Sequence, residues 1–318
     1  MNPYRQDVLT QAHLPTTDDA RLGAAIEVTG LTKWFGRTCA VDDLTFSVAP
    51  GEILGFVGPN GAGKSTTLRI LMGLVFASAG SARLLGGSAL DSNPAARANV
   101  GYLPGSPALY PRLTSRECLL FLQRVRGGRY EQRISELAQR LDLDLDIHIH
   151  DLSRGNKQKT ALIAALMHSP RVLLLDEPTS GLDPLVQREV ERILREEAAR
   201  GVGVLLSSHV LSEVEELADR VLMLHRGRTL LVSSMRDITG RLAQRLTFEF
   251  PSTAHAEWFA RVGDVTAVEA HGRYLECTIT GAQAEVLASA SEHGVIAVHS
   301  HEQRLEDVFT SLVEGRAA

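Results

Sequence analysis

The sequence lacks long apolar runs, clustered cysteines and an excess of basic charge. Its best candidate for a membrane span, residues 161–167, is followed by a His-Ser-Pro sequence and falls short of the roughly 18 apolar residues that a spanning helix needs. The three cysteines, Cys39, Cys118 and Cys277, match no zinc or disulfide spacing. The net charge is −5, whereas a nucleic-acid-binding protein usually presents a basic face. We therefore expect no membrane span, no nucleic-acid partner and a reducing compartment.

The N-terminal segment, residues 1–24, is polar and aperiodic, so we expect a mobile arm. It has no basic region followed by an apolar stretch, which a signal peptide would show, and this favours a cytoplasmic location. The whole chain contains 44% hydrophobic and 22% charged residues in a length of 318. That composition is typical of a globular protein with one large or two modest domains.

Strand and helix patterns alternate from Ile26 onward. A strand at residues 53–57 runs into a glycine-rich loop and then into a helix, and residues 106–168 have mainly helical patterns. Two short apolar runs, 172–177 and 203–208, are typical of strands buried in a parallel sheet. This alternation predicts an α/β fold built on a parallel sheet.

A second domain is expected over residues 244–318, after a polar linker at about 233–243. Its pattern gives the order β-α-β-β-α-β, which is the order of the ferredoxin-like α+β motif, followed by one more helix. The expected elements are two strands at 245–250 and 295–300, a hairpin that turns at His271 and Gly272, and helices at 256–262, 282–294 and 304–315.

Residues 58–65 read G-P-N-G-A-G-K-S and match the phosphate-binding pattern G-x-x-x-x-G-K-[ST]. A strand enters this loop and a helix leaves it, as the motif requires. Glycines let backbone N–H groups close around phosphate oxygens at the start of the helix. Lys64 is expected to reach the β- and γ-phosphates, and the Ser65 hydroxyl is expected to bind Mg²⁺. The sequence therefore predicts a P-loop NTPase.

Two carboxylates, Asp176 and Glu177, end the apolar run at 172–177. Such a pair could simply end a strand in solvent, but beside a phosphate loop both residues serve one reaction. Asp176 is expected to hold Mg²⁺, and Glu177 is expected to polarise the water that attacks the γ-phosphate.

A second cluster suited to an anion lies at 152–159, L-S-R-G-N-K-Q-K, at the start of a helix. Taken in order, GPNGAGKST, LSRGNKQK, LLLDEPTSGLDP and LSSH resemble the motifs of ATP-binding subunits of ABC transporters. The resemblance covers about residues 26–236 and implies a nucleotide-binding domain with a helical subdomain at about 106–168. The tail with RLEDVF resembles the accessory domain of ATPases from two-component, ABC-2-type exporters of drugs or polysaccharides.

The resemblance implies that two such domains pair head to tail. Ser153 and Gly155 would then hold the γ-phosphate of the ATP bound in the partner's glycine loop. Because this chain has one glycine loop and one such signature, it is expected to pair with a second copy of itself. Arg154 and Asn156 depart from the family's usual glycine and glutamine.

Further roles follow from single matched positions. The resemblance implies that Phe35 stacks on adenine, with Trp34 as the alternative and core packing as the other reading of Phe35. His209 matches the switch histidine that contacts the γ-phosphate and the attacking water, and Asp183 lies in the loop that links the two sites. The glycine-loop residues expected to hold ATP are Gly58, Pro59, Asn60, Gly61, Ala62, Gly63, Lys64, Ser65 and Thr66.

Gly105 stands where the family usually has a glutamine that senses Mg²⁺ and the membrane subunit. This departure implies that coupling to the membrane subunit uses the neighbouring stretch 106–116, in which Tyr110 and Leu113 are the candidates.

Two other polar clusters have a less specific pattern. Asp142, Asp144, Asp146, His148 and His150 could share one strand face and bind a hard metal ion, but the stretch is expected to be a solvated connection. The stretch 299–302, His-Ser-His-Glu, has no cysteine or third histidine nearby and is not expected to bind zinc.

The predicted function is that of an ATP-hydrolysing subunit that drives a separate membrane permease, with export as the expected direction. It would be cytoplasmic and held at the inner face of the membrane by the permease. Two alternatives remain: a soluble ATPase of the same superfamily that acts on ribosomes or DNA, and a resistance protein that sequesters a drug in its C-terminal domain.

Overall fold

The computed structural model describes residues 23–90, 97–241, 244–259, 262, 265–279, 283–301 and 305–317. The expected N-terminal arm falls almost wholly outside these ranges. The chain divides after Ser233 into two compact units, which are described separately. Among the residues described, no helix is long and apolar enough to cross a membrane.

The first unit contains two sheets. The antiparallel sheet has the strand order β2-β1-β4-β5, and the larger sheet has the order β10-β9-β3-β8-β7-β6. In the larger sheet, the successive neighbours from β9 through β3, β8 and β7 to β6 all pair in parallel, as the apolar runs predict. The strands are β1 (Ile26–Phe35), β2 (Thr38–Val48), β3 (Ile53–Val57), β4 (Ala79–Leu84), β5 (Gly87–Ser88), β6 (Val100–Leu103), β7 (Val172–Asp176), β8 (Gly203–Ser208), β9 (Arg220–His225) and β10 (Arg228–Ser234).

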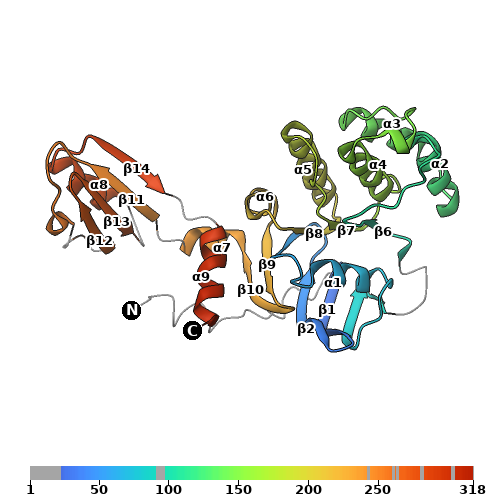
Figure 1. Ribbon diagram of the computed structural model, residues 1–318, viewed down its shortest axis with the longest axis horizontal. Helices are drawn as coiled ribbons and strands as arrows, with labels where there is room; N and C mark the ends of the chain where they lie inside the picture. The colour runs from blue at the N-terminus through green and yellow to red at the C-terminus, as the bar shows by residue number, and fades with distance from the viewer. Residues whose placement is uncertain are drawn as a thin grey trace. The chain divides into compact units, whose positions relative to one another are not determined.

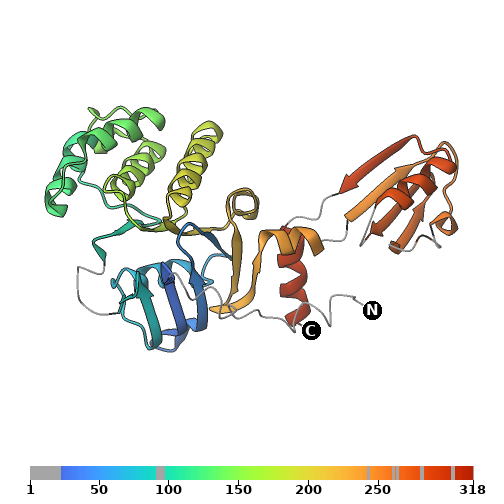
Figure 2. The same cartoon turned by 180° about the vertical axis from the view of Figure 1, so that it is seen from behind.

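The helices of this unit cover the larger sheet on both faces. Figure 1 shows α1 and the antiparallel sheet on one side of it, and α4, α5 and α6 on the other. Both views of the ribbon show α2, α3 and α4 grouped together, as expected for the helical subdomain (Figure 2). The helices are α1 (Lys64–Leu71), α2 (Ser115–Arg126), α3 (Glu131–Arg140), the 3-10 helix η4 (Ile149–Asp151), α4 (Arg154–Leu166), α5 (Pro184–Ala199) and α6 (Leu211–Leu217).

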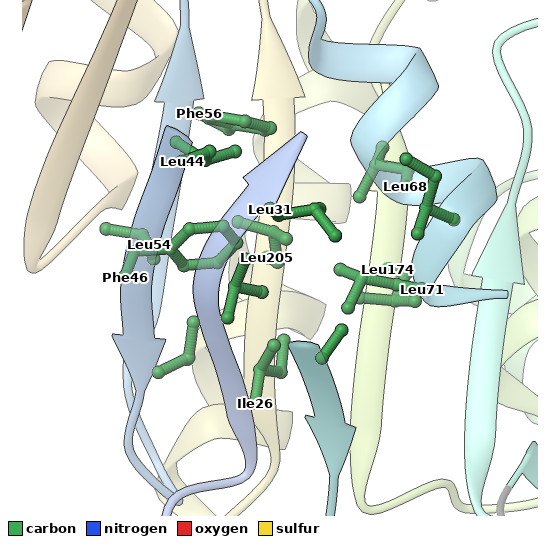
Figure 3. Close-up of a cluster of buried hydrophobic side chains, with 14 of the residues drawn as sticks. Ile26, Leu31, Leu44, Phe46, Leu54, Phe56, Leu68, Leu71, Leu174 and Leu205 are labelled. Atoms are coloured by element: carbon green, nitrogen blue, oxygen red, sulfur yellow. The ribbon is translucent and has the colours of Figure 1, made fainter. Parts of the chain in front are cut away.

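The main core lies between the two sheets and fixes the start of α1. Leu68 and Leu71 on one side of α1 are fully buried in one cluster with Leu54, Leu174 and Leu205 of the larger sheet (Figure 3). Full burial of a leucine side chain stabilises the fold by about 1.5–3 kcal/mol. Because α1 is held on this core, the loop between β3 and α1 is presented at the carboxyl end of the sheet, where ligands bind in open α/β folds.

Glycines on the other face let helices approach the strands closely. A Cβ at Gly55 in β3 would lie 2.1 Å from Cγ1 of Val214 in α6. A Cβ at Gly101 in β6 would lie 2.2 Å from the carbonyl oxygen of Ala165 in α4. Side chains at these two positions would push α6 and α4 away from the sheet.

Polar contacts also fix the helical region. Thr114 and Glu117 form a capping box at the start of α2. Arg140 of α3 donates from Nε to Glu189 and from Nη1 to Glu196 of α5, both at 2.6 Å. The hydrogen bond to Glu196 is the main cause that raises the pKa of Arg140, against a smaller effect of burial. These ion pairs tie the helical region to the helix that follows the carboxylate pair.

The second unit has one antiparallel sheet in the order β12-β13-β11-β14 and a core of its own around Phe248, Phe250 and Phe259. The first and third strands of the predicted motif, β11 and β13, are central. The elements are α7 (Met235–Arg241), β11 (Gln244–Glu249), the 3-10 helix η5 (Ala256–Trp258), β12 (Val265–His271), β13 (Tyr274–Ile279), α8 (Gln283–Glu292), β14 (Ala297–His301) and α9 (Leu305–Ala317).

Two local predictions need correction. The stretch at about 233–243, predicted as a polar linker, has regular structure in its described part, because β10 continues to Ser234 and α7 covers Met235–Arg241. Met235 and Ile238, three positions apart, are both buried, and this apolar spacing stabilises the short helix. The helix expected at 256–262 is only the 3-10 turn η5 in its described part, with residues 260 and 261 outside the description.

Candidate active site

The loop between β3 and α1 has the backbone of a phosphate cradle. Gly58, Gly61 and Gly63 have φ angles of +155°, +81° and +107°, which favour glycine. A Cβ at Gly63 would lie 2.5 Å from the carbonyl oxygen of Ala40, so no other residue fits there without a shift. A Cβ at Gly61 would meet nothing within 4 Å, so this part of the loop faces open space. The loop fits the approach of an anion to the backbone at the start of a helix.

Lys64 begins α1 and folds its side chain under the loop. Its Nζ donates to the carbonyl oxygens of Gly58 at 2.5 Å and Pro59 at 3.2 Å. Burial lowers the pKa of the Lys64 ammonium, whereas the charges of Glu177 and Asp176 act in the opposite direction. The charge of the Lys64 ammonium therefore interacts with the charges of both carboxylates.

Asp176 ends β7 and is buried. One of its oxygens, Oδ1, accepts a 2.6 Å hydrogen bond from Ser207 Oγ on the neighbouring strand β8. The other oxygen, Oδ2, would lie 3.0 Å from a Cβ at Gly105. The structure thus places Gly105 directly beside Asp176, where a side chain would compete for the same space. Oδ2 is the oxygen that can face a cation.

Glu177 and His209 lie side by side after β7 and β8. His209 Nδ1 is 2.8 Å from Glu177 Oε1, and both side chains are partly open to solvent. Glu177 has a φ of +53°, a left-handed conformation that costs a residue with a side chain about 1–3 kcal/mol and needs support from its surroundings. Its N–H donates to the carbonyl oxygen of Ser207, and its carbonyl accepts from Gln158 Nε2 at 3.0 Å.

Ser207 and Gln158 contact the two carboxylate residues of the candidate site, and neither contact was predicted from the sequence. Ser207 bridges the two carboxylate residues, because its hydroxyl donates to Asp176 and also accepts from the Glu177 N–H at 3.3 Å. Gln158 lies inside the quoted stretch LSRGNKQK, but no role was predicted for it. For Ser207, the only feature of the sequence that could have indicated this contact is its position after the apolar residues of β8.

Ser153 caps α4, and the segment beside it contacts the loop that follows Glu177. The Ser153 hydroxyl is exposed and accepts from the N–H of Asn156 at 3.2 Å. Arg154 Nη2 donates to Ser180 Oγ at 3.0 Å, and a Cβ at Gly155 would lie 2.8 Å from the carbonyl oxygen of Gly181. Within the described ranges, the hydrogen bonds of Ser153 and Arg154 do not reach the glycine loop.

Asp183 is exposed and serves as the N-cap of α5. Its Oδ1 accepts from the N–H groups of Leu185 and Val186, both at 3.1 Å. Within one chain, Asp183 therefore stabilises the start of α5. Its predicted contact with the second site of a dimer would be a further role.

The two candidate aromatics lie at the hairpin between β1 and β2. Trp34 and Phe35 are 48% and 50% exposed, so Phe35 is not a core residue. Lys33 Nζ lies 4.8 Å from the centroid of the Phe35 ring, over its face. Both rings are thus open to a planar ligand.

The polar stretch before α4 is not a strand. It consists of turns and η4, and Leu143, Leu145 and Ile149 of this stretch are buried. The alternating residues Asp144, Asp146, His148 and His150 are exposed, as a solvated connection requires, and Arg116 pairs with Asp146. In the described part of the chain, no group of three His, Cys, Asp or Glu side chains is arranged to hold a metal ion. His299 is exposed on β14, and residue 302 lies outside the description.

A glycine phosphate loop on a parallel sheet, with a buried aspartate and an adjacent glutamate at the end of a nearby strand, defines a P-loop nucleotide-binding protein.

The sequence profile of the ABC transporter family matches residues 41–180. The chain is 32% identical to the bacitracin transport ATP-binding protein BcrA of Bacillus licheniformis, covering 92% of this chain and 99% of that protein. It is 31% identical to Nod factor export ATP-binding protein I of Rhizobium etli, with 93% and 95% covered.

Solved structures agree with this assignment. An ATP-binding subunit of an ABC transporter superposes with a TM-score of 0.64 and 33% identity, covering 67% of this chain and 91% of that one. A dimeric bacterial ABC transporter cassette shares the fold, with a TM-score of 0.61 and 23% identity over 66% of this chain and 99% of that one. The chain belongs to the ATP-binding subunits of ABC transporters.

The choice between the two aromatics can be tested by binding. We expect Phe35→Ala to weaken ATP binding about tenfold, because stacking of a base on an aromatic ring contributes about 1–3 kcal/mol. Trp34→Ala is the matched control, since this neighbouring ring is equally exposed. Calorimetric titration with ATP and with inorganic tripolyphosphate separates base from phosphate recognition. A larger ATP-specific loss in Trp34→Ala would assign the stacking to Trp34.

Proposed function

We propose that the chain hydrolyses ATP and thereby powers a separate membrane permease. The observation that carries this proposal is the contact between Glu177 and His209 at 2.8 Å, next to the buried Asp176. A carboxylate held by a histidine, at the same end of the parallel sheet as a phosphate-binding loop, is suited to accept a proton from water.

Each residue has a task that follows from its surroundings. Lys64 holds a positive charge under the glycine loop, where the β- and γ-phosphates would lie. Asp176 Oδ2 and the Ser65 hydroxyl would hold Mg²⁺, an ion that prefers oxygen ligands and that neutralises phosphate charge when bound. Glu177 accepts the proton of the attacking water, and His209 orients the Glu177 carboxylate. The oxygens of Asp176 and Ser65 fit such an ion chemically.

Pairing of two chains completes each site in this proposal. Ser153 is exposed at the N-terminus of α4, a helix of 13 residues, and that end favours an anion. The sequence contains one glycine loop and one signature segment. A head-to-tail dimer would place the signature of one copy on the phosphate bound by the other, so both copies are needed for each hydrolysis.

Export by a two-component transporter is supported by the relatives that match almost the whole chain. Their names refer to bacitracin transport, Nod factor export and linearmycin resistance, and each match covers at least 90% of this chain. The chain would then act at the inner face of the membrane, held there by the permease.

Coupling to the permease is proposed to use the surface around Tyr110. Its ring is 48% exposed and meets Phe121 edge to face, with centroids 5.1 Å apart. Leu113, the second predicted residue, is instead packed against the cluster of Cys118, Ile149 and Leu152, so its replacement would also disturb packing. Tyr110 is therefore the better probe.

The test uses the chain and its permease reconstituted in vesicles. Tyr110→Ala should reduce permease-stimulated ATP hydrolysis about tenfold, since exposed tyrosines that become buried in an interface are frequent hot spots, and should affect the isolated chain far less. Phe76→Ala is the matched control, because Phe76 is 75% exposed and lies outside this surface. Equal stimulation of the parent and Tyr110→Ala would show that this coupling surface is misplaced. Absence of Mg²⁺-dependent hydrolysis by the parent would overturn the proposed function.

A further inference from the structure

The first two turns of α4 contact the loop 177–183 at three points. Arg154 donates to Ser180, and Gly155 lies against Gly181, as described above. One turn further along, Gln158 Nε2 donates to the carbonyl oxygens of Glu177 at 3.0 Å and Pro178 at 3.3 Å. The helix that presents the signature is thus connected to the backbone that carries the hydrolytic carboxylate of the same chain.

Gln158 is the inner and most enclosed of these contacts. Its residue is only 6% exposed, and its amide donates to the carbonyl oxygen of Glu177, which also accepts from the N–H of Ser180 at 3.2 Å. On the opposite side, Ser207 on β8 accepts a hydrogen bond from the Glu177 N–H. The left-handed backbone of Glu177 is therefore held on its N–H side by the sheet and on its carbonyl side by α4 and by the turn to Ser180.

We propose that Gln158 is a positioning residue for Glu177 of its own chain, although it lies on the helix that serves the partner's nucleotide. This inference rests on the proposed function. A change in the tilt of α4, caused by a phosphate at Ser153 and Gly155, would be passed by the Gln158 amide to the peptide of Glu177. The occupied site of one copy would in this way set the catalytic geometry of the other.

Replacement of Gln158 by methionine removes the donor and keeps a side chain of similar size in the buried place. We expect ATP hydrolysis to fall by roughly 10- to 100-fold, because a displacement of about 1 Å caused by a mutation away from the chemistry can cost that much. The ATP dissociation constant should change far less, since the glycine loop is untouched. Thr160→Val is the matched control: it also removes a buried polar group from α4, one that bonds Asn156 and Ser115 but not the loop 177–183.

The decisive measurement uses mixed dimers with one working site. Lys64→Ala disables the glycine loop of one copy, and Ser153→Arg disables the signature of the other. Hydrolysis in this mixture then depends on Glu177 of the Ser153→Arg copy and on the signature of the Lys64→Ala copy. Gln158→Met is added either to the Lys64→Ala copy or to the Ser153→Arg copy. A general folding defect would lower hydrolysis equally in the two mixtures.

If Gln158 positions Glu177 of its own chain, the loss is at least about fivefold greater when Gln158→Met is in the Ser153→Arg copy, as expected for displacement of a catalytic group. An equal loss in both arrangements, or a greater loss in the Lys64→Ala copy, would show that Gln158 supports only the signature and would overturn the inference. An inactive mixture without Gln158→Met would overturn the proposed head-to-tail site, and the inference with it.

Discussion

Glu177→Gln should stop ATP turnover while ATP remains bound. The amide keeps the size of the carboxylate but cannot accept a proton from water, and general-base assistance typically contributes about 10²–10⁴ in rate. Affinity for the phosphates depends on the glycine loop and Lys64, which this substitution leaves in place. Phosphate release should therefore fall by at least about 100-fold, and ATP-bound dimers should accumulate on size exclusion.

The matched control is Glu189→Gln, which makes the same chemical change at a partly buried carboxylate. Glu189 pairs with Arg140 and Arg192 and does not touch the site. It should keep hydrolysis close to that of the parent, even if the α3–α5 contact weakens. Hydrolysis by Glu177→Gln at the parent's rate would show that Glu177 is not the general base. The proposed role of His209 in orienting that carboxylate would then also be wrong.

The parts of the site that could be predicted from the sequence are those encoded locally. The glycine loop is specified by three glycines and a lysine within eight positions, and the positive φ angles of the three glycines favour glycine at those positions. Asp176 and Glu177 were predicted because an apolar run ends at them, and parallel strands of one sheet present such ends together. The α/β fold and the helical region followed from periodicity in the same way.

The supports of the site could not be predicted, because they join residues that are far apart in the chain. Ser207 reaches Asp176 across 31 positions, and Gln158 reaches Glu177 across 19. Their partners depend on which strands become neighbours and on where α4 packs, and hydrophobic periodicity specifies neither. Polar residues such as these look like surface residues until the strand order is known.

The surroundings of Gly105 give a physical reason for the glycine at this position. The sequence indicated only that a side-chain ligand is missing. The structure adds that a Cβ at this position would lie 3.0 Å from Asp176 Oδ2, so even alanine would crowd this carboxylate oxygen. The glycine thus leaves room for water beside the proposed ion, and water is a good ligand for Mg²⁺.

Ser153→Arg should prevent the ATP-dependent dimer while each chain still binds nucleotide. Ser153 is exposed at the start of α4, where a large cation would occupy the place proposed for the partner's phosphate and lie against the positive end of the helix. We expect dimerisation to weaken by roughly 100-fold, because a bulky side chain forced into a packed contact costs about 1–3 kcal/mol and would keep the two chains apart. Analytical ultracentrifugation with ATP and the Glu177→Gln background measures it.

Loss of the cap must be separated from loss of the phosphate contact. Ser153 Oγ accepts from the N–H of Asn156, and removal of such a cap typically costs about 1 kcal/mol of stability. Ser153→Asp keeps a capping oxygen and suits the helix dipole, yet repels a phosphate. It should therefore retain the parent's melting temperature and still fail to dimerise, whereas Ser153→Ala should lose some stability and dimerise better than either charged variant. If Ser153→Asp dimerises with ATP as tightly as the parent, no phosphate of the partner lies at this helix end.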